Sequence, residues 1–78
     1  FNPTTSIEFN LAEDAIVTLK IYNTLGQEVA TLVDHEDFTE GNNTVEFDAS
    51  HLSTGVYFYQ IMVNDGQFQQ AKKMMLVK

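Results

Sequence analysis

The sequence contains no cysteine and no run of about 18 or more apolar residues. No disulfide can therefore add stability, no Cys/His spacing for a structural zinc ion is present, and we expect no metal, no cofactor and no transmembrane segment. Glycine is also scarce, with four residues and no glycine-rich phosphate loop. The fold must depend on the apolar residues, 44% of the chain, and on six phenylalanines and three tyrosines.

Basic residues are few as well. Four lysines stand against eleven acidic residues, for a net charge of −7, so the surface should repel nucleic acid. We expect residues 1–78 to form one domain, with a core too thin for a catalytic cleft of roughly 300–1,000 Å³. No signal peptide opens the chain, and Phe1 is not an initiator methionine, so we expect a fragment or processed piece of a longer protein.

Three of the four lysines, Lys72, Lys73 and Lys78, fall within residues 72–78. That segment carries a charge of +3, whereas residues 1–71 carry −10. One interpretation is that lysines on an edge strand guard against aggregation of sheet edges. The other is that a basic, apolar, strand-forming segment is recognised by an acidic or membrane-associated partner.

Apolar and polar residues alternate along most of the chain, and no segment has a helical period. Val17, Leu19 and Ile21, for example, are typical of a half-buried strand. The alternation predicts strands at about 5–11, 16–22, 27–33, 43–49, 56–63 and 68–77, and a short seventh strand could lie in the acidic stretch 34–40. Gly26 and Asn64-Asp65-Gly66 are hairpin signals. This pattern predicts an all-β protein, either an antiparallel β-sandwich or a small barrel.

Leu52, Gly55, Tyr57 and Tyr59 have the spacing of a tyrosine corner, which favours the sandwich. In that arrangement one tyrosine returns its hydroxyl to the backbone a few residues upstream. The face that carries the two tyrosines is predicted to be the core, because Gln60 on the opposite face would be costly to bury. The predicted core residues of this strand are Tyr57, Tyr59, Ile61 and Val63, and the predicted outer residues are Val56, Phe58, Gln60 and Met62.

The polar residues offer several candidate sites, but none has the spacing of a known one. Asp34, Glu36, Asp37 and Glu40 could supply oxygen ligands to calcium, but they match no EF-hand, and a solvated loop is the favoured interpretation. A pair of carboxylates could also serve a glycosidase, which would need a groove that nothing here implies.

The two histidines, His35 and His51, are both predicted to lie in ordinary surface loops. A catalytic pair with Ser50 or Ser53 would need a third, orienting group, and the sequence has no Gly-x-Ser-x-Gly turn. Tyr22 and Phe58 could stack on sugars from the outer face of a sandwich, but the favoured interpretation is that they pair across strands or lie under a sheet edge.

Four motifs follow one another along the chain. They are the opening stretch 1–9 with Asn2 and Pro3; the stretch 19–29; the residues Asp48-Ala49-Ser50, Leu52 and Gly55-Val56-Tyr57; and the residues Lys72-Lys73-Met74, Leu76 and Lys78. In these motifs the whole chain resembles the type A C-terminal sorting domain of the type IX (Por) secretion system, and we expect the residues of the last motif, together with Val77, to be the ones recognised. The segment 72–78 departs from the family in having no arginine.

The resemblance implies an immunoglobulin-like or fibronectin-III-like antiparallel β-sandwich of six to seven strands. It implies a sorting signal at the C-terminal end of a cargo protein, which is exported through the periplasm and an outer-membrane translocon to the cell surface of a Bacteroidota-like bacterium. A sortase commonly removes such a domain, at a site expected upstream of residue 1. Catalysis would belong to the cargo or the sortase, so we do not expect this chain to be an enzyme.

We therefore interpret the chain as a non-catalytic sorting domain whose final strand, 68–78, lies at or near a sheet edge. Its backbone would pair with a partner strand, and Lys72, Lys73 and Lys78 would supply charge complementarity. Met74 and Leu76 would anchor the strand. Two alternatives remain open: a carbohydrate-binding or adhesion module, and a structural immunoglobulin-like spacer such as that of a flagellar hook-capping protein.

Overall fold

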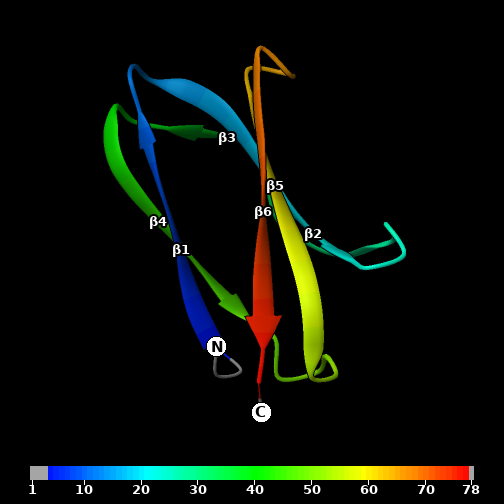
Figure 1. Cartoon of the computed structure of the whole chain (residues 1–78). Helices are drawn as coiled ribbons and strands as arrows, with labels where there is room; N and C mark the ends of the chain where they lie inside the picture. Colours follow the sequence, from blue (N-terminus) through cyan, green and yellow to red (C-terminus); the bar gives the residue numbers. More distant parts are fainter. Residues whose placement is uncertain (1–3, 78) are drawn as a thin grey trace.

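The computed structural model describes residues 4–77, which form six β-strands in two antiparallel sheets (Figure 1). The strand pair β1–β4 makes one sheet, and the order β3-β2-β5-β6 makes the other. The strands are β1 (Thr4–Leu11), β2 (Ala15–Asn23), β3 (Glu28–Phe38), β4 (Gly41–Asp48), β5 (Gly55–Val63) and β6 (Phe68–Leu76). The predicted all-β sandwich is confirmed. The described residues include no helix of the length and apolarity needed to traverse a bilayer.

The core lies between the two sheets and is built from alternate residues of each strand. Val17, Leu19 and Ile21 on β2 are fully buried, and Ile7 of β1 and Phe47 of β4 close over them from the other sheet. Burying each of these side chains favours the folded state by about 1.5–3 kcal/mol. The alternation seen in the sequence is therefore the alternation between core and solvent.

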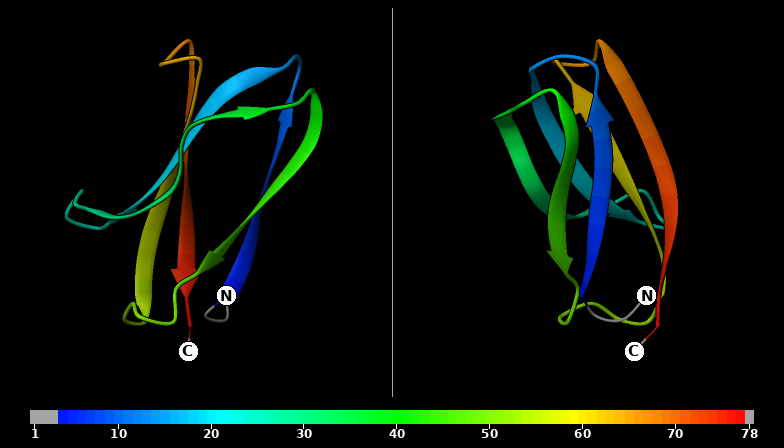
Figure 2. Two further views of the ribbon diagram at one scale, coloured as in Figure 1. Left: turned by 180° about the vertical axis from the view of Figure 1, so that it is seen from behind. Right: turned by 90° about the vertical axis from the view of Figure 1, so that its left-hand side faces the viewer.

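The sandwich is closed on one side and open on the other. β3 runs directly into β4 and contacts it, which joins the sheets along that side. On the opposite side β1 and β6 are the outermost strands of their sheets (Figure 2, right). Each of these two strands pairs with a single neighbouring strand among residues 4–77.

Both hairpin signals are confirmed. Gly26 adopts a φ of 80°, and the side-chain oxygen of Asn23 accepts hydrogen bonds from the backbone of Leu25 and Gln27 at 3.0 Å each. In the β5–β6 turn, Asn64, Asp65 and Gly66 all have positive φ. These residue types tolerate that conformation better than others, which is why they mark the turns.

The prediction for residues 34–40 was wrong in one respect. No separate seventh strand or irregular loop lies there, because β3 continues to Phe38. The strand is interrupted by a bulge at His35, whose φ is 51° and whose backbone N–H donates to the Thr18 hydroxyl at 3.1 Å. Phe38 then packs against Phe9, with ring centroids 5.3 Å apart. This aromatic contact holds the acidic segment against the sandwich.

Candidate functional site: the edge strand β6

β6 forms one edge of the four-stranded sheet, as predicted. It pairs with β5 in an uninterrupted antiparallel register, from Val63 opposite Phe68 to Gly55 opposite Leu76. The other edge of β6 has no strand partner among residues 4–77. A regular strand with a free edge presents a row of backbone donors and acceptors to any chain that can lie beside it.

The two faces of β6 have different environments because successive residues of a strand point to opposite sides. Leu76 is fully buried and Met74 packs against the core, so these two residues hold the strand on the sandwich. Met75 on the other face is 55% exposed. Val77, which follows the strand, is 53% exposed. The predicted strand reached Val77, whereas β6 ends at Leu76.

Lys72 and Lys73 lie in the middle of β6 and are both exposed. Lys72 shares the inward face with Met74 and is opposite Tyr59, whereas Lys73 shares the outer face with Met75 and is opposite Phe58. Neither lysine forms an ion pair with any residue of the described range 4–77. Both ammonium groups are therefore available to a partner.

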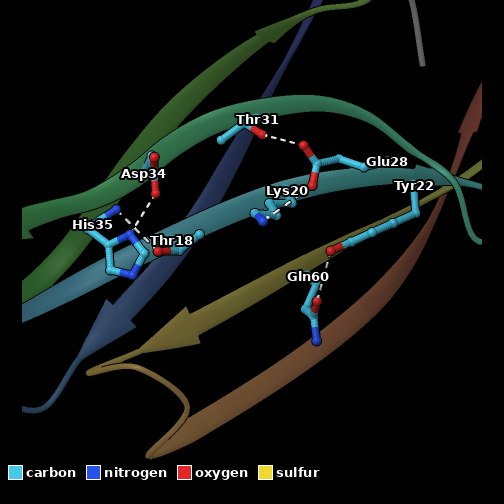
Figure 3. Close-up of polar contacts among 8 residues, drawn as sticks. All are labelled: Thr18, Lys20, Tyr22, Glu28, Thr31, Asp34, His35 and Gln60. Atoms are coloured by element: carbon cyan, nitrogen blue, oxygen red, sulfur yellow. Dashed lines mark hydrogen bonds and ion pairs between the residues drawn. The ribbon is translucent and has the colours of Figure 1, made fainter.

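Lys20, the lysine outside this segment, is in a different position. Its ammonium group lies 3.2 Å from the Glu28 carboxylate, and Thr31 donates a second hydrogen bond to that carboxylate at 2.7 Å (Figure 3). Hydrogen bonding to Glu28 raises the pKa of Lys20, and the hydrogen bonds from Thr31 and Lys20 lower the pKa of Glu28. The charge of Lys20 is thus partly satisfied within the sheet.

The tyrosine corner is present and faces the end of β6. Tyr57 is 8% exposed, and its hydroxyl donates a hydrogen bond to the carbonyl of Ser53 at 2.8 Å. Gly55 and Tyr57 are the register partners of Leu76 and Met74. The loop before the corner is held by hydrogen bonds from Leu52 N to Ala49 O and from Ser50 N to the Asp48 carboxylate, each at 2.9 Å. Bonding to Ser50 also lowers the pKa of Asp48.

The predicted inner and outer faces of β5 are confirmed. Tyr57 and Ile61 are buried, whereas Phe58 is exposed on the outer face of the sheet. Tyr22 and Phe58 are direct register partners across β2 and β5, and the Tyr22 hydroxyl donates to the Gln60 side chain at 3.3 Å (Figure 3). Pairing across strands, the favoured interpretation of these aromatics, is what the structure shows.

The other candidate residues lie on β3, just after it, and in the loop between β4 and β5. His35 lies in the β3 bulge, not in a loop, so that part of the prediction was wrong, whereas His51 does lie in the loop between β4 and β5. Glu36 and Asp37 are exposed strand positions. Within residues 4–77, no group of three or more His, Asp or Glu side chains is placed to hold a metal ion.

Two features were missed by sequence reasoning. One is a groove of about 310 Å³ between β1 and β6, which we call the open groove. The other is the contact of His35 with two carboxylates, Asp34 at 2.6 Å and Asp65 at 2.9 Å. The sequence signal for the groove is a pair of aromatic residues, Phe9 and Phe68. Each occupies an inward-facing position near one end of its strand.

Three of the predicted site residues, Asn2, Pro3 and Lys78, lie outside the described residues. In a comparison with known families, a model described as a secretion system C-terminal sorting domain matches residues 2–78. No curated protein and no solved structure matches the chain.

Proposed function

The chain belongs to the family of secretion system C-terminal sorting domains, and on this premise we propose that it carries an N-terminally linked cargo across the outer membrane through the type IX translocon. The family implies export to the cell surface or the extracellular space. In this proposal residues 1–78 are one domain that follows the cargo, in a Bacteroidota-like bacterium. A sortase then acts at a site upstream, and the domain itself does no chemistry.

The part of the domain that is recognised is β6 with the residues that follow it. The observation that supports this most directly is the pair of exposed lysines, Lys72 and Lys73, which have no acidic partner in the described chain. Backbone groups on the free edge of β6 would give affinity, and the ammonium groups would steer the encounter and set the register. The proposed recognition residues are Lys72, Lys73, Met74, Leu76, Val77 and Lys78.

A second set of residues would position this strand. Leu52, Gly55 and Tyr57 belong to the corner that leads into β5, and Gly55 is opposite Leu76 in the β5–β6 register. A hydrogen-bonded corner limits the conformations available to the end of β6. Binding of a partner would therefore cost less conformational entropy, because the end of β6 is already ordered. Asn2 and Pro3 complete this set of structural residues in the proposal.

The experiment is an export assay on a cargo fused to the domain. Deletion of residues 72–78 should leave the cargo inside the cell, but it also removes Leu76 from the core. A double variant, Lys72→Gln with Lys73→Gln, keeps the core and should also lower export. The control is Thr24→Glu with Leu25→Glu, which gives the same change in net charge at exposed positions of the β2–β3 turn. Unchanged export of both test variants would overturn the proposal.

A further inference from the structure

We propose that the open groove binds an extended, acidic segment of a partner protein, which adds to the edge of β6 over residues 68–73 and places one carboxylate beside Lys72 and the next beside Lys73. This inference rests on the proposed function and specifies the chemistry of the partner. It extends the recognition site from the edge of β6 to the space between the two sheets.

The groove runs along the open side of the sandwich. β1 supplies one wall, β6 supplies the other, and β5 forms the floor; the lining includes Glu8, Phe9, Tyr59, Ile61, Phe68 and Lys72. At the end near the β5–β6 turn it adjoins a second hollow of about 430 Å³, which shares Leu11, Val63 and Phe68. The two hollows together follow β6 from Phe68 to Lys72.

The open side is the one suited to strand addition. The β1–β4 and β5–β6 pairs are both in uninterrupted register. β3, which forms the other edge of the larger sheet, shows three register shifts against β2 and carries exposed acidic residues. Bulges and charged side chains are the usual protection of a sheet edge. β6 has no bulge, and its charges, Lys72 and Lys73, oppose a basic strand but favour an acidic one.

The groove also has apolar surface to cover. Phe68 points inward but is 54% exposed, because no strand lies beside it on the open side. A strand added at the usual spacing of about 4.8 Å would bring every second side chain over the groove, since the sheets are roughly 10 Å apart. Apolar side chains at those positions would cover Phe68 and Phe9.

Charge determines which strand fits. Lys72 faces the groove and Lys73 faces the outer side of the sheet, so two adjacent acidic residues on a partner strand would meet one lysine each. Opposite charges at paired positions stabilise a sheet, and like charges destabilise it. The preferred partner segment therefore has two neighbouring acids and apolar residues at alternate positions beyond them.

A second copy of this chain fits less well. Two β6 strands would place lysines against lysines, and β1 has a single acid, Glu8, between two apolar residues. β3 does contain the neighbouring acids Glu36 and Asp37, but the bulge at His35 precedes them and breaks the ladder. The edges of this domain thus favour a different chain as the partner.

The test uses the whole chain with a synthetic peptide of about nine residues, the length of a typical strand. The peptide alternates valine and threonine and carries two adjacent glutamates near its centre; its control has lysines in their place. NMR titration of the amide signals should show changes along β6 and β1 with the acidic peptide. The basic peptide should bind about tenfold more weakly or not at all.

A variant with the opposite charge on β6 distinguishes a loss of recognition from a loss of folding. The variant Lys72→Glu with Lys73→Glu should reverse the preference and bind the basic peptide, with an unchanged circular dichroism spectrum. The inference would be overturned if both peptides bound equally well or if the amide changes lay elsewhere on the surface. It would also be overturned if light scattering detected a dimer of the domain that excludes the peptide. Export lost in the glutamine variant while the domain shows no peptide preference would overturn this inference alone and leave the sorting function standing.

Discussion

Gly55 and Leu76 lie directly opposite each other in the β5–β6 pair. Gly55 precedes Tyr57 by two residues, and the Tyr57 hydroxyl closes the corner by donating to the Ser53 carbonyl. The corner and the end of β6 are therefore one structural unit. The hydrogen bond at Tyr57 fixes the start of β5, the start of β5 pairs with the end of β6, and Leu76 attaches that end to the core. Changes at the corner should consequently alter the position of the end of β6.

Tyr57→Phe removes the hydroxyl and leaves the Ser53 carbonyl without this donor. The free energy of unfolding should fall by about 0.5–1.5 kcal/mol, the usual net value of one hydrogen bond. Urea denaturation measures it. Tyr59→Phe is the matched control, because Tyr59 is half-buried on the same strand and its hydroxyl has no hydrogen bond to residues 4–77. Equal losses in the two variants would contradict the role assigned to the corner.

Leu76→Ala should destabilise the domain by about 2–5 kcal/mol, because a fully buried side chain is replaced by a cavity. Val77→Ala, one residue further on, should change stability by no more than about 0.5 kcal/mol, since Val77 is exposed. Thermal unfolding of both variants checks this. A small effect of Leu76→Ala would mean that β6 is not attached to the core through this residue.

His35 should make stability depend on pH. Its hydrogen bond to Asp34 raises the pKa of the imidazole above its ordinary value of 6.5, with a smaller contribution from Asp65. A group whose pKa is raised on folding stabilises the protein fully below its unfolded pKa, and the stabilisation is lost as the pH rises through the folded pKa. The domain should therefore be more stable at about pH 5.5 than at about pH 8.

The variant His35→Asn tests this dependence, because asparagine tolerates the positive φ of the bulge better than most residues. The difference in stability between the two pH values should shrink in this variant and persist in His51→Asn, which changes a histidine in the β4–β5 loop. A difference that survives in His35→Asn would assign the pH dependence to another group.

The strands and turns of this fold could be predicted because each depends on local pattern. Val17, Leu19 and Ile21 show the period of a strand with one buried face, and Asn64-Asp65-Gly66 specifies a turn. The second half of β3 was expected only as a possible separate strand, because Asp34, Glu36 and Asp37 are acidic and exposed. Its position depends on the contact between Phe38 and Phe9, a tertiary interaction that has no local signature.

The candidate site, too, could be predicted only in part. The exposure of Lys72 and Lys73 and the burial of Leu76 follow from alternation along one strand. The open groove does not, because it arises from the division of six strands into sheets of two and four, with β1 and β6 on the same side. Sheet order depends on long-range pairing, which the period of a single strand does not determine.

The most direct test of the central claim is the export of a cargo fused to the domain that carries Lys72→Glu with Lys73→Glu. The domain should fold as the unmodified one does, since both side chains are exposed and lack ion-pair partners within residues 4–77. The account predicts that the cargo accumulates in the periplasm and is depleted from the medium. Cargo that reaches the cell surface and medium at the level of the unmodified fusion would contradict it.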